Sequence, residues 1–158
     1  GTLAEAETGI EAYKPLPRQT NLGLECSFST GVQRHKVLWW LAIFTGTISH
    51  YAAFRWDLLN LKVEYLDSTN TYVTLGTMNP NYNNIEMFNT GKIVVDYLKT
   101  NYMRVLLNEI EYSLSGIPYL TGVNTTAPHM RARISIVQDG SLNDTFYVDD
   151  FIITQNEP

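Results

Sequence analysis

Carboxylates are the side chains of this sequence that are best suited to bind a metal ion or to act in catalysis. Asp139, Asn143 and Asp144 lie close together in a polar stretch near the C-terminal end. Their oxygen atoms are of the type that Ca²⁺ prefers, but the spacing does not fit an EF-hand loop, and polar turns commonly contain the same residues. We therefore predict no metal ion and no other cofactor, and we leave open whether Asp139 and Asp144 bind Ca²⁺.

The other carboxylates give no local support for acid–base catalysis. Asp149 and Asp150 are adjacent, so on a strand their side chains would point to opposite faces. A glycosidase needs two carboxylates about 5–10 Å apart across a sugar cleft. Glu109 and Glu111, or Glu64 with one of the aspartates, would meet this requirement only through tertiary folding. Because no nucleophile motif and no phosphate-binding loop occurs either, we predict that the protein is not an enzyme.

The composition indicates a protein with a large buried core or with surfaces that contact partners. Hydrophobic residues make up 44% of the 158 residues, aromatic residues 12% and charged residues 17%, whereas about 25% of residues are charged in ordinary domains. The net charge of −5 argues against broad binding to phosphate groups. Cys26 is the only cysteine, which excludes an internal disulfide and favours a small buried hydrophobe there. The many aromatic side chains must be buried or offered to partners.

One segment combines aromatic and charged residues. Arg55 and Asp57 flank Trp56, and on a strand these two charges share a face, where they could pair with each other or bind a neighbouring chain. The other two tryptophans, Trp39 and Trp40, are adjacent. Tryptophans are more often core residues than ligand platforms. An interface at this segment therefore requires that its side chains are exposed on the surface.

Short runs in which apolar and polar residues alternate predict an all-β fold. In residues 59–65 the apolar residues occupy every second position. We expect strands over residues 53–66, 71–78, 93–98, 105–114, 131–137 and 145–154. Residues 33–44 fit both a helix and a buried strand, and we predict one short helix there. Strands of this length and spacing are typical of an antiparallel β-sandwich of jelly-roll type.

The N-terminal part of the sequence differs from the rest. Residues 1–31 contain Pro15, Pro17 and internal glycines that interrupt every periodic pattern. We therefore predict two regions, an extended N-terminal arm over residues 1–31 and a jelly-roll β-sandwich domain over residues 32–158. The longest apolar run, Val37–Phe44, is too short for a helix that spans a membrane.

Three segments resemble parts of picornavirus-like capsid proteins, the icosahedral shell proteins of picornavirus, dicistrovirus, iflavirus and marnavirus type. The first is Leu41–Leu66, where the resemblance rests on Tyr51, Phe54, Arg55, Asp57, Leu58 and Leu61. The second is Asn108–Leu120, which ends in Ile-Pro-Tyr-Leu, and the third is Phe146–Ile153, which contains Asp-Asp-Phe. The three segments follow one another in the same order as in that family, and Glu7-Thr8-Gly9 is similar to an N-terminal motif of some members.

The resemblance implies a structural protein, namely a β-sandwich subunit of a small icosahedral RNA-virus capsid that is cut from a polyprotein. Its partners would be other capsid subunits, with genomic RNA on the inner face and a host receptor whose identity stays open. The protein would reside in the virion and, during assembly, in the host cytoplasm. We predict that the interface between subunits includes Tyr51, Phe54, Arg55, Trp56 and Asp57.

Two other functions fit the same fold class. A carbohydrate-binding, lectin-like β-sandwich would use Phe146–Thr154 as its last strand and would place Trp39, Trp40 or Trp56 on the sugar-binding face. An enzyme such as a glycosidase is the third interpretation, and it ranks last because no carboxylate pair is visible.

Overall fold

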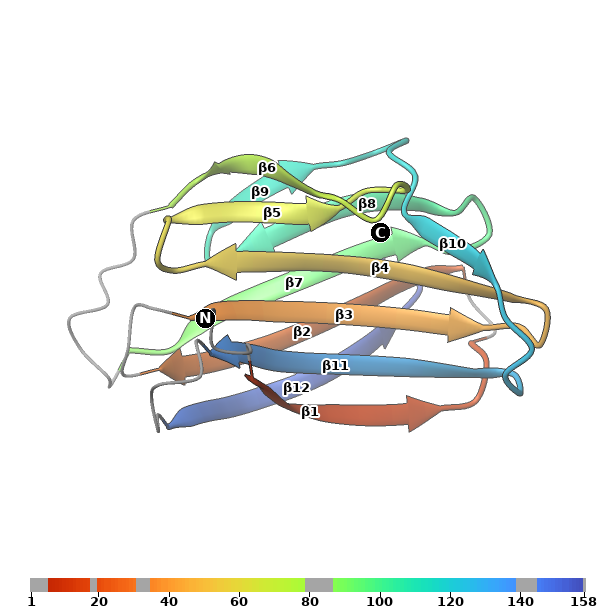
Figure 1. The fold of residues 1–158 in the computed structure, drawn as a ribbon, viewed down its shortest axis with the longest axis horizontal. Coiled ribbons are helices and arrows are strands. Elements are labelled where there is room, and N and C mark those ends of the chain that lie inside the picture. The colour runs from red at the N-terminus through yellow and green to blue at the C-terminus, as the bar shows by residue number, and fades with distance from the viewer. Residues whose placement is uncertain (1–5, 18–19, 31–34, 79–86, 139–144, 158) are drawn as a thin grey trace, which may run out of the picture.

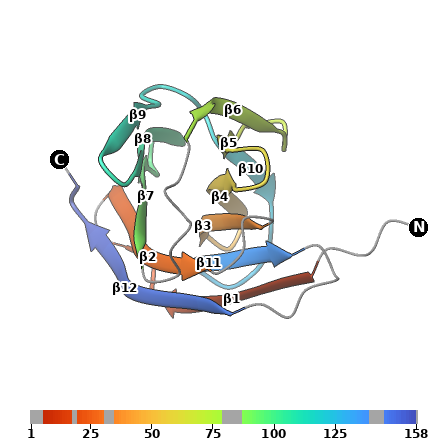
Figure 2. The same ribbon diagram turned by 90° about the vertical axis from the view of Figure 1, so that its left-hand side faces the viewer.

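The computed structural model describes residues 6–17, 20–30, 35–78, 87–138 and 145–157, and every regular element within these ranges is a β-strand. The strands form two antiparallel sheets that face each other across a common core (Figures 1 and 2). The predicted all-β, antiparallel β-sandwich is therefore confirmed. No helix that could cross a membrane occurs in the described ranges.

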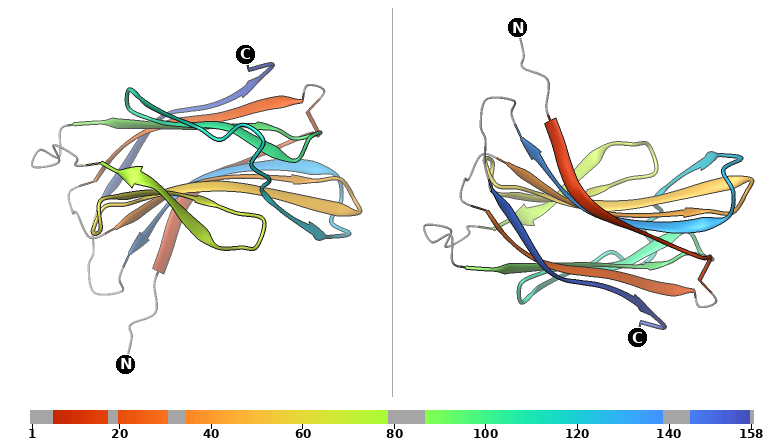
Figure 3. Two further views of the ribbon diagram at one scale, coloured as in Figure 1. Left: turned by 90° about the horizontal axis from the view of Figure 1, so that it is seen from above. Right: turned by 90° about the horizontal axis from the view of Figure 1, so that it is seen from below.

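The two sheets differ in size. In spatial order, the seven-stranded sheet contains β1 (Ala6–Lys14), β11 (His129–Gln138), β3 (Lys36–Phe44), β4 (Ile48–Asp57), β5 (Lys62–Leu66) and β6 (Tyr72–Thr77), and β10 (Leu120–Val123) pairs with the first part of β4. The five-stranded sheet contains β12 (Phe146–Gln155), β2 (Asn21–Thr30), β7 (Asn89–Asp96), β8 (Asn101–Leu107) and β9 (Ile110–Ser113). Figure 3 shows the two sheets from above and from below, and Figure 1 shows β1 and β12 along the same border of the molecule.

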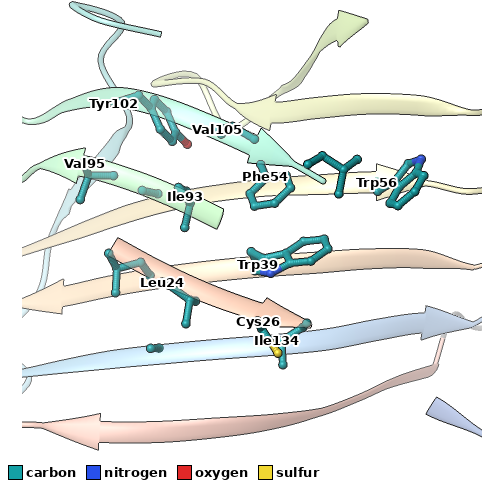
Figure 4. Packing of buried hydrophobic residues seen from close by; sticks show 14 of the residues in the cluster. Leu24, Cys26, Trp39, Phe54, Trp56, Ile93, Val95, Tyr102, Val105 and Ile134 are labelled. Atoms are coloured by element: carbon teal, nitrogen blue, oxygen red, sulfur yellow. The ribbon is translucent and has the colours of Figure 1, made fainter. Parts of the chain in front are cut away.

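Aromatic side chains from both sheets form the centre of the core (Figure 4). Trp39 of β3 is fully buried, and its ring stacks on Phe54 with 4.4 Å between the ring centroids. Phe28 of β2 meets the Trp39 ring edge-on, with the centroids 5.3 Å apart. Gly91 of β7 lies against the same ring, and a Cβ atom at this position would collide with it. The Trp39 ring therefore occupies space that the opposite sheet leaves free by using glycine.

Tyr102 of β8 connects the two sheets through its hydroxyl group. β10 pairs with β4 as far as Tyr51, and β5 pairs with β4 from Phe54 onward, so Ala53 has no strand partner on that side. The Tyr102 hydroxyl fills this break, because the Ala53 N–H donates to it at 3.0 Å and it donates to the Leu66 carbonyl at 2.7 Å. Burial raises the pKa of Tyr102, so the hydroxyl stays protonated and can act as this donor.

The predicted helix over residues 33–44 is wrong for the described part of that range. Residues 36–44 form β3, a central strand that pairs with β11 on one side and with β4 on the other. Val37, Trp39 and Leu41 are buried in the core, while Leu38 and Trp40 on the opposite face are half-buried. Both faces of the strand therefore carry apolar residues, and such a continuous run does not distinguish a strand from a helix.

The predicted N-terminal arm over residues 1–31 is also wrong where the structure describes that range. β1 pairs with β11 along its whole length, and β2 lies between β12 and β7. Leu22, Leu24, Cys26 and Phe28 of β2 are fully buried. Gly23 and the polar residues between the others obscure this period-two pattern in the sequence. The described residues of this range belong to the same sandwich as the described residues after position 34.

Two of the predicted strands are hairpins. Residues 53–66 contain the end of β4 and all of β5, and residues 105–114 contain the end of β8 and all of β9. Residues with positive φ make the two turns, 55° at Leu61 and 53° at Asn108. Leu61 continues the alternating apolar pattern across its turn, which is why the sequence indicates one long strand there. The remaining predicted strands overlap β6, β7, β11 and β12.

The C-terminal residues fold back onto the outer face of the five-stranded sheet. Glu157 is 7% exposed, and its carboxylate lies 2.9 Å from Lys92 Nζ and 3.5 Å from Arg104 Nη2. The Thr154 hydroxyl also donates to this carboxylate, and the Asn21 side-chain amide donates to the Glu157 backbone carbonyl at 3.0 Å. Burial acts to raise the pKa of Glu157, but the hydrogen bonds from Thr154 and Lys92 and the nearby positive charges outweigh it, so the pKa is lowered.

We expect Glu157 to make the free energy of unfolding depend on pH. Because its folded-state pKa lies below the ordinary value of 4.5, the carboxylate stabilises the fold above that value, and this contribution is lost as the pH falls through the folded-state pKa. The Glu157→Gln variant should be less stable at neutral pH by about 1 kcal/mol and should respond less to acid. Urea denaturation at neutral and acidic pH measures both effects, with Glu109→Gln at an exposed position as the control. An unchanged response to acid in Glu157→Gln would contradict this role.

Candidate ligand-binding site

The seven-stranded sheet presents a polar and aromatic outer face. Alternate residues of each strand point away from the core, and the register places Glu11 opposite Arg133 and Arg133 opposite Trp40. The outer face also includes Glu7 of β1, Arg131 and Ser135 of β11, Leu38 of β3, Tyr51 and Arg55 of β4, Glu64 of β5, and Tyr72 and Thr74 of β6.

A hollow of about 270 Å³ lies on this face. It is lined by Glu7, Leu38, Trp40, Leu66, Asn70, Tyr72 and Arg133. β1 and β6 are at opposite ends of the strand order (Figure 2), and in a flat sheet five strand spacings would separate them by about 24 Å. Since Glu7 of β1 and Tyr72 of β6 line one hollow, the sheet must curve, with its concave side facing outward.

One wall of the hollow is an ion pair between β1 and β11. Glu7 accepts a hydrogen bond from Ser135 Oγ at 2.6 Å, and its Oε1 atom lies 3.2 Å from Arg133 Nη2. Arg133 lies directly opposite Trp40 in the register of β11 and β3. This wall therefore offers a guanidinium donor and a carboxylate acceptor next to an indole ring.

The opposite wall is built around Tyr72. The Arg55 guanidinium lies over the Tyr72 ring, 3.8 Å from its centroid, and Arg55 Nε donates to Glu64 Oε2 at 2.6 Å. Thr74 Oγ1 donates to the other Glu64 oxygen at 3.5 Å. Burial raises the pKa of Tyr72 to about 12, against the opposing charge of Arg55 and with the help of the Glu7 and Glu64 charges. The Tyr72 hydroxyl is therefore a neutral hydrogen-bond donor at neutral pH.

Trp40 is the aromatic residue in the middle of this face. Its ring stacks with Tyr51, with 5.5 Å between the centroids and 18° between the planes, and the Arg131 guanidinium lies 4.9 Å from its centroid. Trp40 is only half-buried and lines the hollow, so part of the indole is open to a ligand. An aromatic ring that two neighbours hold in place is a preorganised surface for the apolar part of a ligand.

The predicted interface residues divide between the two faces of β4. Tyr51 and Arg55 lie on the outer face, where both are half-buried. Phe54 and Trp56 are fully buried, so the prediction that they form a surface interface is wrong. The physical reason is the period-two alternation of the strand, which turns even-numbered residues of this segment into the core.

Asp57 stabilises a turn instead of meeting a partner. It is 4% exposed and accepts hydrogen bonds from the Asn60 backbone N–H at 3.0 Å and from the Asn60 side-chain amide at 2.9 Å. Arg55 does not pair with Asp57, which was one of the two alternatives considered above, and forms its ion pair with Glu64 on the neighbouring strand.

The remaining sequence predictions concern metal ions and Cys26. Within the described ranges, no group of three or more His, Cys, Asp and Glu side chains could hold a metal ion. Asp139 and Asp144 lie outside the described residues.

Cys26 is buried as predicted, and burial together with the Asp149 and Asp150 charges raises its pKa to about 12. A thiol with so high a pKa is not a nucleophile at neutral pH.

The sequence did not indicate Glu7, Tyr72 and Arg133 as site residues, and Glu7 was named only in the motif Glu7-Thr8-Gly9. Alternation along each strand places them on polar faces, but it does not indicate that residues so far apart in the sequence meet. The pairing of β1 with β11 brings Glu7 to Arg133, and the curvature of the sheet brings Tyr72 of β6 to the same hollow. Of the three tryptophans considered for a sugar-binding face, Trp40 alone lies on the surface, and the other two are fully buried.

The fold described above is a two-layer antiparallel β-sandwich, and two solved structures that are carbohydrate recognition domains are similar to it in fold. The carbohydrate recognition domain of Emp47p aligns with a TM-score of 0.55 and 9% identity over 96% of this chain and 78% of that chain. The potassium-bound carbohydrate recognition domain of Emp46p aligns with a TM-score of 0.53 and 11% identity over 94% of this chain and 76% of that chain. These identities establish a likeness of fold alone. No protein-family model matches the sequence, and no curated protein matches it.

Proposed function

We propose that the outer face of the seven-stranded sheet binds a neutral carbohydrate in the hollow beside Trp40. The observation that carries this proposal is a partly open indole ring in the same hollow as the paired Glu7 and Arg133. The C–H faces of sugars are attracted to the negative face of an aromatic ring, and sugar hydroxyl groups both donate and accept hydrogen bonds. The hollow offers the hydrogen-bonding groups of this ion pair together with the part of the indole that Tyr51 and Arg131 leave uncovered.

The charges of this face favour a neutral ligand. Arg133 is paired with Glu7 at 3.2 Å, and Arg55 is paired with Glu64 at 2.6 Å. Such pairs keep donor and acceptor positions for hydroxyl groups, but an anionic ligand would meet a carboxylate beside each guanidinium. The hollow of about 270 Å³ is near the lower end of the range for small-molecule sites, which suits a short saccharide.

The comparisons support this proposal at the level of the fold. Two solved structures with a similar sandwich are carbohydrate recognition domains. Their identities of 9% and 11% transfer no site residue to this chain, so the proposed binding residues rest on the geometry of the hollow.

A panel of neutral glycans tests the proposal. We expect at least one of them to change the tryptophan fluorescence of the wild-type protein on binding. Trp40→Ala should weaken that binding about tenfold, equivalent to about 1.4 kcal/mol, because the stacking surface is lost. Tyr147→Ala, at a residue that is 55% exposed on the other sheet, should bind as the wild type does in isothermal titration calorimetry. Absence of binding across the panel, or full affinity in Trp40→Ala, would contradict the proposal.

A second candidate function, the capsid subunit that the sequence resemblance implies, is supported by apolar side chains along one border of the sandwich. β1 and β12 lie along this border (Figure 1), and these two strands and the segment after β1 carry large exposed apolar residues on more than one face, namely Ile10, Tyr13, Leu16, Tyr147 and Ile152. In a shell, neighbouring subunits would cover such side chains. This function requires closed particles of uniform size in electron micrographs of the concentrated protein, and a field without particles speaks against it.

A further inference from the structure

The strands at the borders of the two sheets differ in how well they resist pairing with another chain. β9 has four residues, and β6 has six, with a register shift in the pairing of β5 and β6. β12 is longer, but its pairing with β2 shifts between Asp149 and Ile152, and Asp150 there has a φ of 51°. Both aspartates at this bulge are exposed. Short strands, bulges and charges are the devices by which proteins block edge pairing.

β1 has neither the short length nor the bulge of these strands, although it ends in an exposed lysine, Lys14. Its nine residues pair with β11 in one unbroken register and include no proline. Glu7 and Glu11 are the carboxylates of this strand, and each is held on the outer face by an arginine of β11, at 3.2 Å and 2.6 Å respectively. Ile10 between them is 49% exposed. The side of β1 that faces away from β11 is therefore a long, regular strand edge.

The sequence of β1 fits antiparallel pairing with a second copy of itself. The register that overlaps the whole strand places Ile10 opposite Ile10, Glu7 opposite Tyr13 and Glu11 opposite glycine. Sliding one copy by two residues places Glu11 opposite Glu11 in one direction and Glu7 opposite Glu11 in the other. Like charges that lie directly opposite each other destabilise a strand pair, so the fully overlapping register is favoured.

We propose that two copies of the chain pair antiparallel along β1, with Ile10 against Ile10 at the twofold axis. This pairing joins two seven-stranded sheets into one continuous sheet and satisfies the open backbone groups of both edges. It uses the same strand of each copy, so it closes at the dimer. The pairing does not depend on carbohydrate binding, because it uses the strand edge and not the hollow.

The mass of the protein in solution tests the pairing. We expect the wild-type chain to sediment as a dimer, with twice the 18.0 kDa mass of one copy. Ile10→Lys places two ammonium groups opposite each other at the axis and should give a monomer at the same concentration. Ile152→Lys, at a residue that is 42% exposed on β12, should stay dimeric. Circular dichroism confirms that both variants are folded, and a monomeric wild type or a dimeric Ile10→Lys overturns the proposal.

Single introduced thiols test the register. Residues that lie opposite each other in an antiparallel pair have Cα atoms about 4.5–5.5 Å apart, within the range for a disulfide. With oxidised glutathione, which accepts the two electrons and is reduced to two thiols, Ile10→Cys should form a disulfide-linked dimer. Thr8→Cys should not, because Thr8 lies opposite Ala12 and the two thiols would be about 13 Å apart. Since Cys26 is buried, the wild-type chain serves as the blank. Equal cross-linking of both variants, or cross-linking of neither, overturns the proposed register.

Discussion

Replacing Trp39 with alanine is expected to lower the free energy of unfolding by about 3–5 kcal/mol, a large part of the 5–15 kcal/mol that is typical of a small domain. The Trp39 side chain is fully buried, stacks on Phe54 and receives the edge of Phe28. Gly91 on the opposite sheet has no side chain that could move into the cavity, so the structure can relax only a little. Urea denaturation followed by far-ultraviolet circular dichroism measures the loss.

Trp40→Ala is the matched control for this variant. It removes the same side chain from the next position of the same strand, but from the half-buried outer face, and should cost about 1–2 kcal/mol because less apolar area leaves the protein interior. If Trp39→Ala were no more destabilised than Trp40→Ala, the assignment of the two faces of β3 would be wrong.

Tyr102→Phe is expected to lower the free energy of unfolding by about 1–3 kcal/mol although it removes one atom. In the wild type the hydroxyl accepts from the Ala53 N–H at 3.0 Å and donates to the Leu66 carbonyl at 2.7 Å. In the variant the Ala53 N–H and the Leu66 carbonyl stay buried but lose the hydroxyl as their partner. No strand can take the place of the hydroxyl, because Ala53 lies in the break between β10 and β5. An unpaired buried polar group costs more than the net gain of an ordinary hydrogen bond.

Hydrogen exchange separates this explanation from a simple packing effect. The amide of Ala53 should exchange slowly in the wild type and faster in Tyr102→Phe, because the variant lacks the acceptor of that N–H group. Tyr112→Phe, which removes a hydroxyl from a half-buried tyrosine on the adjacent β9, should change stability by less than about 0.5 kcal/mol. Unchanged exchange at Ala53 in Tyr102→Phe would show that the hydroxyl does not close the break.

The period-two pattern predicts most strands because the sandwich buries one face of each of them. It fails at β2, where Gly23 lies against the side chains of Thr154 and Glu157, which a Cβ atom at this position would displace. In the sequence the same glycine indicates a break in structure. At β3 the apolar outer face removes the alternation altogether, and the pattern alone does not separate helix from strand.

The candidate site is less accessible to sequence reasoning than the fold. Trp39 and Trp40 are neighbours of the same type, and a register change of one residue would exchange the core residue for the surface residue. The contact of Glu7 with Arg133 follows from the pairing of β1 with β11, which neither segment specifies without its partner. The alternation of residues along one strand indicates which face of the sheet a side chain lies on. Which residues lie beside it on the neighbouring strands depends on the strand order, which this alternation does not indicate.

The concave shape of the outer face has a consequence for the proposed pair of chains. Antiparallel pairing along β1 has its twofold axis perpendicular to the joint sheet, so both hollows open toward the same side. Once one hollow has engaged a ligand on a surface, the other meets neighbouring ligands at an effective concentration that can reach about the millimolar range. Sites that are individually weak would then hold the pair to a densely glycosylated surface by avidity, while a free saccharide of the same type would exchange rapidly.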